Sequence, residues 1–551
     1  MVCSGKKIEL SISDFKDFIQ GNYLYIDKSQ FIEHVLTSNR IQLICRPRRM
    51  GKSLNLSMLK YFFDMDEQSE DLFADLYISK TSYWEALNQY PVIYLNFKEL
   101  RRDDYIESFA AMVEEELSCY VKEHEFSSFT RNAMTSPYTL IRSLLKYTCK
   151  NIYDKYNKKP IILIDEYDKL IIDNADNEQI HEIKEFLRAV LSSALKDNPF
   201  IERAIITGVN RIAHESLFSD LNNIAIDDVF TSTIFDSDFG FTEEEVQTLY
   251  TRINPNQLNI PLDTLRCWYN NYLVGNSYVY FSYSLMSSLY YSRLNNYWGR
   301  SGVMDTIRKH INSGRFEQLT KVLNEYPQYG IEISIKDRLS IHDLKDLSDD
   351  DAFYSMLIQT GYLSYEMLSK PEELATKPQL VRIANLESKL VWEEFLLKNI
   401  YGGKIQDIKN MFKNYKDPTK MSMDLTTAFN NKLSYYDFEA NEPEKTYHVF
   451  LAGILTALGY KWSSNRESGL GRYDLFADLH DFHAIFEFKK AEDMNKLDKG
   501  AEEAITQIFT RRYVEDYAES PNLYFIGVAF EGKMCGVRVQ KYEMINTQTD
   551  L

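Results

Sequence analysis

The sequence predicts an α/β fold class in which the N-terminal part is a doubly wound parallel sheet. Short, mostly apolar runs occur at residues 92–95, 161–164 and 204–207, and helical stretches such as 138–152 lie between them. Strands that alternate with helices in this way are typical of βαβ units. The run at 161–164 contains no polar residue, which indicates a strand buried on both faces.

A further apolar run, at residues 41–45, leads into a phosphate-binding motif that ends in Gly51-Lys52-Ser53. In such a motif the backbone N–H groups of a helix start face the phosphates, the lysine reaches their oxygens and the hydroxyl binds Mg²⁺. Arg46 stands where the pattern G-x-x-x-x-G-K-[ST] begins with Gly. The residues expected at the nucleotide are Arg48, Arg49, Met50, Gly51, Lys52, Ser53 and Leu54.

Two acidic residues, Asp165 and Glu166, follow the apolar run at 161–164, as in a Walker B strand. Asp165 is expected to hold Mg²⁺ through water, and Glu166 to polarise the attacking water in phosphoryl transfer. The alternative is a surface turn after a core strand, in which Asp168 and Lys169 are solvated charges. Because the phosphate-binding motif lies upstream, the two patterns together predict ATP binding.

Asn210 and Arg211 follow the run at 204–207. Ligands bind beyond the carboxyl ends of strands in open α/β sheets, so both residues are candidates for sensing the γ-phosphate. The alternative is a loop capped by the Asn, with a solvated Arg.

A second chemical site is predicted near the C-terminus. Asp474 precedes an alternating strand at 484–490, on which Glu487 and Lys489 share one face. The two carboxylates would form a hard-oxygen site for Mg²⁺ or Mn²⁺, and Lys489 would orient water or stabilise charge on a scissile phosphate. This is metal-dependent phosphodiester hydrolysis in outline.

Two flanking helices add to the second site. Glu444 opens an amphipathic stretch that runs to residue 458 and could project towards the same metal, and Gln507 lies within a predicted helix at 501–513. The alternative is an edge hairpin in which Glu487 and Lys489 form an exposed ion pair of little energetic value.

The composition indicates a large globular protein. The 551 residues are 44% hydrophobic and 26% charged, and no run of about twenty apolar residues could span a bilayer. No apolar segment follows the first residues, so we expect no signal peptide and a cytoplasmic location. Six cysteines without a C-x-x-C pair argue against a zinc site. The net charge of −18 counts against a uniformly basic nucleic-acid-binding surface.

The middle of the chain, about 242–415, is expected to be mainly helical and holds no clear chemical motif. Its aromatic pairs at 268–269, 290–291 and 297–298 are interpreted as core residues rather than as stacking platforms.

With both sites located, the chain resembles AAA-ATPase-like proteins that carry a C-terminal PD-(D/E)XK nuclease-superfamily domain. The resemblance covers nearly the whole chain, and an Arg-Pro-Arg-Arg lead-in to the motif is usual in this family. The phrases that carry it are residues 25–28, 46–54, 163–168, 207–212, 239–246, 361–363, 444–448, 471–474, 487–489 and 507–508.

The resemblance implies a P-loop NTPase sheet of five strands, with Lys52 and Ser53 on the phosphates and Mg²⁺, Asp165 on Mg²⁺ and Glu166 as the hydrolytic residue. It also implies a core triad of Asp474, Glu487 and Lys489, supported by Glu444 and Gln507. The expected domains are an AAA-like ATPase domain at 1–240, a mainly helical lid or connector at 241–430 and a PD-(D/E)XK nuclease-like domain at 431–551.

The expected function is ATP binding and hydrolysis, coupled to a metal-dependent nuclease-like domain that acts on DNA or RNA. One alternative is a nucleotide-gated signalling or scaffold protein whose nuclease-like domain binds but does not cleave. Another is an ATPase whose C-terminal domain stabilises a homo-oligomer. In an oligomer a neighbour could donate an arginine to the site, and Arg188 is a weak candidate.

Overall fold

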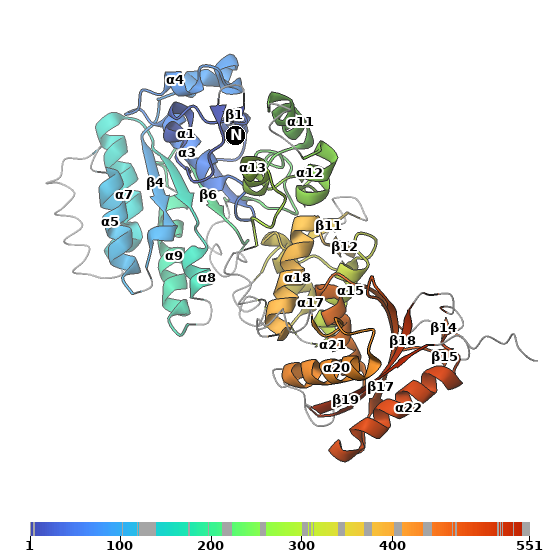
Figure 1. Ribbon diagram of the computed structural model, residues 1–551. Helices are drawn as coiled ribbons and strands as arrows, with labels where there is room; N and C mark the ends of the chain where they lie inside the picture. Colours follow the sequence, from blue (N-terminus) through green and yellow to red (C-terminus); the bar gives the residue numbers. More distant parts are fainter. Residues whose placement is uncertain are drawn as a thin grey trace, which may run out of the picture. The chain divides into compact units, whose positions relative to one another are not determined.

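The computed structural model divides into two compact units, each formed by two segments of the chain. The first unit contains Met1–Ser301 and Ile331–Ser388, and the second contains Gly302–Gly330 and Lys389–Leu551 (Figure 1). The structure describes all residues except 1, 4–5, 102, 118–119, 121–138, 175–176, 197, 212–222, 254–259, 300–306, 308–309, 312, 340–347, 368–376, 402–409, 434–443, 465–466, 469–470, 515–516, 518–519, 521, 533 and 543–551. The expected division at 240 and 430 stays a prediction.

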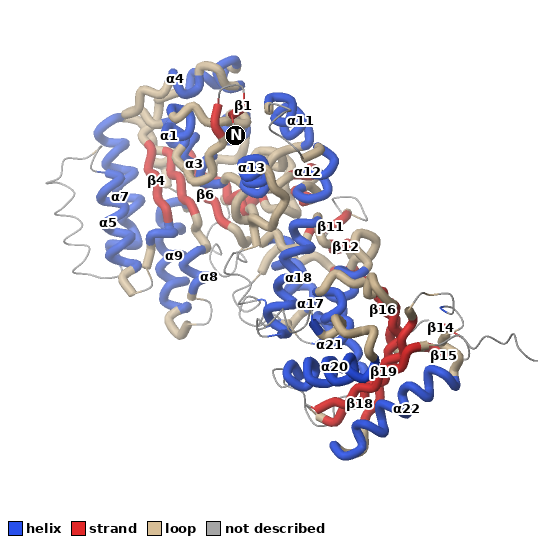
Figure 2. The backbone as a smooth tube through the Cα atoms, in the orientation of Figure 1, coloured by secondary structure: helices blue, strands red, loops and turns tan. Residues whose placement is uncertain are grey.

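The first unit is built around a parallel sheet of five strands, as the alternating apolar runs predict (Figure 2). Along the sheet the strands are β4 (Val92–Asn96), β5 (Ile161–Asp165), β6 (Arg203–Gly208), β3 (Ile41–Cys45) and β7 (Ala225–Asp227). The strands β3 and β5 are buried at every position, because both lie inside the sheet and are covered. The carboxyl ends of β3, β5 and β6 therefore meet at one edge.

Helices pack on this sheet through alternate strand residues. One core cluster joins side chains such as Leu43, Ile93 and Ile164 to three helices: α5 (Tyr105–Leu117), α7 (Thr139–Tyr156) and α9 (Ile180–Leu195). Outside this cluster, α3 (Lys52–Phe63) follows β3 directly and packs against β4 and β5. The sheet is thus wound with helices as a βαβ pattern requires.

The rest of the first unit consists of short elements. Thr242 and Glu245 form a capping box at the start of α11, which explains why that helix begins at Glu243. The other elements are β1 (Val2–Cys3), β2 (Lys6–Lys7), α1 (Phe15–Gln20), α2 (Gln30–Thr37), α4 (Glu70–Phe73), α8 (Lys169–Asp173), α11 (Glu243–Arg252), α12 (Leu262–Tyr269), β8 (Tyr272–Val274), β9 (Ser277–Val279), α13 (Ser282–Tyr291), β10 (Ile331–Ile333), α17 (Asp350–Gln359), β11 (Ser364–Glu366) and β12 (Gln379–Arg382).

Helix α18 (Leu386–Tyr401) continues from the first unit into the second. The middle of the chain is not only helical, since β8 and β9 pair as a hairpin and β10, β12 and β11 form an antiparallel sheet. Short strands of this kind carry too little periodicity to be separated from helix in the sequence.

The second unit is built around a mixed sheet of five strands: β13 (Lys461–Ser464), β16 (Leu475–Asp478), β17 (His483–Lys490), β18 (Leu523–Glu531) and β19 (Met534–Lys541). Strands β17 and β18 pair in parallel, and the other neighbours are antiparallel. A parallel pair needs a crossover, which α22 (Leu497–Thr510) provides. The remaining elements are α15 (Ser313–Asn324), α20 (Pro418–Leu433), α21 (Glu444–Ala457), β14 (Glu467–Ser468) and β15 (Gly471–Arg472).

Helices α21 and α22 cover opposite faces of this sheet. The ring of His448 on α21 meets Phe488, whereas Gln507 on α22 donates a hydrogen bond to Glu487. Adjacent residues of a strand point to opposite faces, so each helix covers one face of β17. None of the helices in the described part of the chain is long and apolar enough to cross a membrane.

Candidate functional site

The loop between β3 and α3 has the shape that a phosphate-binding motif needs. Gly51 is the N-cap of α3 and lies in the left-handed region at φ 87°, where a side chain would be strained. The first backbone N–H groups of a helix have no partner within the helix. Those of α3 therefore offer donors, and the positive end of the helix dipole, at the tip of the loop.

The side chain of Lys52, the first residue of α3, bonds to this loop. Its Nζ donates to the backbone oxygens of Arg46 and Pro47, both at 3.0 Å, and the residue is 5% exposed. The two carbonyl groups hold the ammonium where the helix start and the loop meet. A side chain tethered in this way places its positive charge beside the free N–H groups of α3.

Ser53 and Asp165 meet although they are far apart in the sequence. The hydroxyl of Ser53 donates to Oδ2 of Asp165 at 2.6 Å, and the hydroxyl of Thr207 donates to Oδ1 at 2.6 Å. Asp165 is 1% exposed. The carboxylate thus joins the ends of β5 and β6 to the start of α3. The sequence pattern singled out Ser53 and Asp165 but not Thr207, whose signal was its place at the end of an apolar run.

Glu166 follows directly after β5 and has a left-handed backbone with φ 56°. Its backbone N–H donates to Oδ1 of Asp165 at 3.0 Å, and the residue is half-buried. A left-handed Glu is uncommon, and it turns the chain sharply away from the strand. Glu166 therefore sits beside Asp165 at the same edge of the sheet.

Asp168 is buried, so the alternative of a solvated surface turn is wrong. Its carboxylate accepts the backbone N–H groups of Val209 at 3.1 Å and Asn210 at 2.8 Å, and burial raises its pKa. Gly208 makes this contact feasible, because a Cβ there would lie 2.7 Å from Oδ1 of Asp168. Asp168 fastens the end of β6 to the loop after β5.

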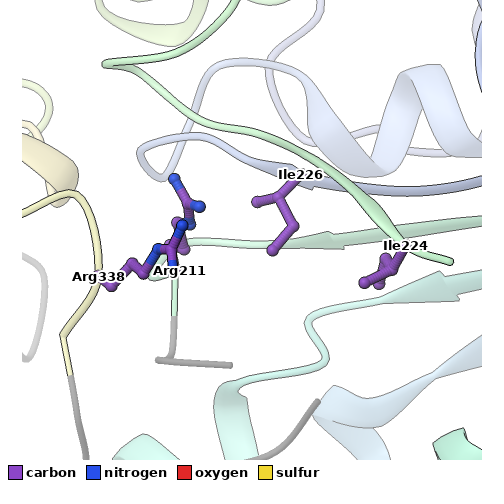
Figure 3. Close-up of a pocket in the computed structure, with 4 residues that line it drawn as sticks. All are labelled: Arg211, Ile224, Ile226 and Arg338. Carbon is purple, nitrogen blue, oxygen red and sulfur yellow. The ribbon is translucent and has the colours of Figure 1, made fainter. Parts of the chain in front are cut away.

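Asn210 and Arg211 are also buried, which overturns the alternative of a solvated Arg. One Nη atom of Arg211 lies 2.7 Å from a carboxylate oxygen of Asp228 and 2.8 Å from one of Asp337. Arg211, Ile224, Ile226 and Arg338 line a cavity of about 220 Å³ (Figure 3). A role in sensing the γ-phosphate stays a prediction.

Arg46, at the first position of the motif, ties the loop to the segment after β7. Its side chain is fully buried and donates to Oδ1 of Asp227 at 2.5 Å, to the hydroxyl of Ser232 at 2.8 Å and to the backbone oxygen of Phe235 at 3.0 Å. The guanidinium group also lies 5.4 Å from the ring centroid of Phe239. A glycine at this position could make none of these contacts.

We predict that Arg46→Met lowers the free energy of unfolding by about 3 kcal/mol or more, because Asp227 keeps a buried charge without its partner. Urea unfolding followed by circular dichroism measures the change. Arg48→Met is the control, since Arg48 lies in the same loop and is half-buried. Equal unfolding free energies of the two variants would contradict a structural role for Arg46.

The other predicted loop residues differ in exposure. Met50 is buried, and its backbone oxygen accepts the N–H of Gly240 at 3.0 Å, whereas Arg48 and Leu54 are half-buried. Arg49 is exposed, and its Nη1 donates to the backbone oxygen of Tyr297 at 2.5 Å. Met50 and Arg49, like Arg46, therefore bond the loop to other segments of the first unit.

Glu387 holds the segment that Arg49 contacts. Its Oε1 accepts the backbone N–H groups of Tyr297 at 2.8 Å and Trp298 at 3.1 Å. Burial raises the pKa of the Glu387 carboxyl from 4.5 to about 7, and the two N–H donors offset only part of that effect. No motif in the sequence singles out Glu387.

This pKa predicts a pH-dependent stability. Between pH 4.5 and 7 the folded protein keeps a proton on Glu387 that the unfolded chain has lost. The contribution of this proton to the free energy of unfolding is therefore full below pH 4.5 and is lost as the pH rises through 7. We expect Glu387→Gln to be more stable than the wild type at pH 8, by about 3 kcal/mol. The difference should vanish below pH 4.5. The free energies of unfolding of both proteins are measured with urea across this pH range. A difference between them that stays the same at every pH would contradict the raised pKa of Glu387.

In the second unit, Asp474, the residue directly before β16, lies beside Glu487 on β17. Leu475, the first residue of β16, pairs with Phe486, the neighbour of Glu487. The backbone N–H of Asp474 lies 3.4 Å from Oε2 of Glu487, and Oδ2 of Asp474 accepts the N–H of Phe488 at 2.8 Å. One carboxylate thus comes from the start of β16 and the other from the neighbouring strand.

Gln507 and Lys489 complete this arrangement. The Nε2 of Gln507 donates to Oε1 of Glu487, and Lys489, two residues further along β17, is half-buried on the same face. Glu487 is 2% exposed, and β17 is the central strand of its sheet. The alternative of an exposed edge hairpin is therefore wrong.

A small residue brings α22 close to Glu487. Gly527 on β18 is the register partner of Glu487, and a Cβ there would lie 2.0 Å from the backbone oxygen of Ala501. The helix backbone can approach the sheet only because this side chain is absent. That close approach places Gln507 within reach of Glu487.

Two predicted residues remain less defined. The backbone of Glu444 begins α21, and its side chain lies outside the described residues. Arg188 lies on α9, with an Nη atom 3.6 Å from a carboxylate oxygen of Glu185.

Across the part of the chain that the structure describes, no three His, Cys, Asp or Glu side chains gather as a metal-binding group. Among the described carboxylates of the second site, Asp474 and Glu487 are the pair that could contact a metal.

Comparison with known proteins finds two family models that match this chain. Residues 9–218 match a family model described as a predicted AAA-ATPase, and residues 442–540 match the PD-(D/E)XK nuclease superfamily. An uncharacterized protein in the vnfD 5' region of Azotobacter chroococcum mcd 1 is 24% identical over 548 residues, which is 96% of this chain and 97% of that protein. No solved structure matches. The chain therefore combines a region that matches the predicted AAA-ATPase family with a C-terminal region that matches the PD-(D/E)XK nuclease superfamily.

Proposed function

We propose that this protein binds and hydrolyses ATP with Mg²⁺ in its first unit, and that hydrolysis controls metal-dependent cleavage of DNA or RNA by its second unit. The observation that carries the proposal is the hydrogen bond between Ser53 and Asp165, 2.6 Å long, beside Lys52 and the free start of α3. A nucleoside triphosphate and its cation require these groups, and all of them lie at one edge of a parallel sheet.

The loop fits the phosphates of ATP. The backbone N–H groups after Gly51 would bind phosphate oxygens, and Lys52 would leave the carbonyl groups of Arg46 and Pro47 to contact the β and γ phosphates. Asn210 and Arg211 follow β6 and would report the presence of the γ-phosphate. Arg211 is already bound to Asp228 and Asp337, so a displaced Arg211 would move the segment that contains Asp337.

The oxygens of Ser53 and Asp165 fit Mg²⁺, because both are hard ligands and the carboxylate carries the compensating charge. A bound Mg²⁺ would neutralise the charge that develops on the transferred phosphate. Thr207 fixes the orientation of the Asp165 carboxylate. Glu166, next to Asp165 and half-buried, would accept the hydrogen bond of the attacking water and orient it.

The second unit fits a divalent cation at Asp474 and Glu487. Mg²⁺ or Mn²⁺ is often held by one or two carboxylates together with water and substrate phosphates, so a third protein carboxylate is not required. The metal would supply Lewis-acid activation at a scissile phosphate. Gln507 orients Glu487, Lys489 would orient water or stabilise the developing charge, and Glu444 would support the same metal.

One other function has support from the chain itself. The net charge is −18, and a protein that wraps nucleic acid through its phosphates usually presents a basic surface. A nucleotide-gated protein whose second unit binds nucleic acid or a partner without cleaving it would retain both folds. Cleaved strands accumulate if the second unit is a nuclease and do not accumulate if it only binds.

The ATPase part is tested by phosphate release from ATP by the purified full-length protein. We expect release with Mg²⁺ and loss of release when EDTA removes the cation. Binding of ATP without Mg²⁺-dependent release would leave the nucleotide-gated function and contradict hydrolysis.

A further inference from the structure

We propose that a surface of exposed and half-buried tyrosines on α13 and the loop that follows it, together with Arg49, binds single-stranded nucleic acid by base stacking. We call it the tyrosine patch, and its members are Arg49, Tyr283, Tyr290, Tyr291, Arg293 and Tyr297. All of them belong to the first unit. The choice of nucleic acid as ligand rests on the proposed function, whereas the location of the patch rests on the side chains.

Two of the rings are unusually exposed for their size. Tyr291 is 59% exposed and Tyr290 is 44% exposed. The expectation that the pair at 290–291 belongs to the core is therefore wrong. The buried positions of α13 include Leu285 and Leu289, whereas the last two residues of the helix are exposed. Trp298, from the neighbouring aromatic pair, is 1% exposed.

The rings are ordered relative to one another. Tyr291 and Tyr297 stack with their planes 9° apart and their centroids 5.9 Å apart, and Tyr290 meets Tyr291 edge-on at 4.8 Å. The hydroxyl of Tyr297 donates to the backbone oxygen of Arg293 at 2.7 Å. These contacts fix the rings before a ligand arrives, which reduces the entropy lost on binding.

Two guanidinium groups accompany the rings. Arg49 lies 4.2 Å from the ring centroid of Tyr283 and donates to the backbone oxygen of Tyr297, and Arg293 is exposed. Each of the two arginines therefore contacts a tyrosine of the patch, in a protein whose net charge is −18. Bases stack on aromatic rings while arginines contact the phosphates, and this combination is typical of sites for single strands.

A single strand fits better than a duplex, because only unpaired bases can expose a face to a tyrosine ring. Arg49 also belongs to the loop that ends in Gly51-Lys52-Ser53, two residues away from Gly51. A strand bound at the patch would therefore contact the nucleotide-binding loop itself. By linkage, ATP and the strand should then change each other's affinity.

The test is a titration of full-length protein into fluorescent single-stranded oligonucleotides, one oligo-dT and one oligo-rU, followed by anisotropy at low salt. We expect the double variant Tyr290→Ala, Tyr291→Ala to bind at least about tenfold more weakly than the wild type. Phe at both positions should retain binding, because stacking needs the ring and not the hydroxyl. Tyr278→Ala is the matched control, since Tyr278 on β9 is 49% exposed and is not part of the patch.

Equal affinity of the double Ala variant and the wild type would overturn the proposal, and so would failure of the wild type to bind either oligonucleotide. Phosphate release from ATP is measured on the same samples. Loss of strand binding in the double variant, with no ATP hydrolysis by any sample, would reject the proposed ATPase while leaving the patch in place.

Discussion

Glu166→Gln is expected to bind ATP as the wild type does and to hydrolyse it about 10²- to 10⁴-fold more slowly. Gln keeps the size of the side chain but is a poor acceptor for the proton of the attacking water. The backbone contact of residue 166 with Asp165 uses the main-chain N–H, so it survives the substitution. Binding is measured with a fluorescent ATP analogue and turnover by phosphate release.

Lys52→Ala provides the contrast. It removes the charge at the phosphates and the two bonds that Lys52 makes to its own loop, so binding and turnover should both be lost. Glu182→Gln is the control, because Glu182 lies on the exposed side of α9 and this variant makes the same change from carboxylate to amide elsewhere on the first unit. Equal loss of ATP binding in Glu166→Gln and Lys52→Ala would contradict the separate roles of the two residues.

Asp474→Ala and Glu487→Gln are expected to reduce strand cleavage at least about 10³-fold, because each removes one of the two carboxylates proposed for the metal. ATP hydrolysis should be unchanged in both. Cleavage is measured by the appearance of fragments on denaturing gels. Lys489→Ala should slow cleavage while leaving metal binding, followed by Mn²⁺ titration, unaffected.

The matched control is Asp478→Ala. Asp478 is the last residue of β16, the strand that Asp474 precedes, and it pairs with His483 at the far end of the register from Glu487. Its loss should leave cleavage as in the wild type. Full cleavage by Asp474→Ala would remove the second unit from the proposed chemistry.

The sequence predicted those features that depend on local pattern. The apolar run at 161–164 forms β5, a strand inside the parallel sheet, because only a strand covered on both faces tolerates so many adjacent apolar residues. Asp165 ends β5 and Ser53 lies at the start of α3, the helix that follows β3, so their meeting at one edge of the sheet followed from the fold class. Asp474 and Glu487 came together for a similar reason, since Asp474 directly precedes β16 and Glu487 lies on β17, the next strand in the chain.

The sequence did not predict contacts that join distant segments. Arg46 bonds to Asp227, 181 residues away, and Arg211 bonds to Asp337, 126 residues away. No periodicity links such partners, and each Arg taken alone is typical of a solvated loop. The exposure of Tyr291 was missed for a related reason, because the side of a short helix that faces the core depends on what packs against it.

The most direct test of the coupled function compares cleavage of single-stranded and duplex DNA and RNA, with Mg²⁺ or Mn²⁺, in the presence and absence of ATP. The wild type and Asp474→Ala are assayed side by side. We predict fragments only with the wild type and only when ATP is present. No fragments from any substrate, while ATP is still hydrolysed, would contradict a nuclease and leave a nucleotide-gated binding protein.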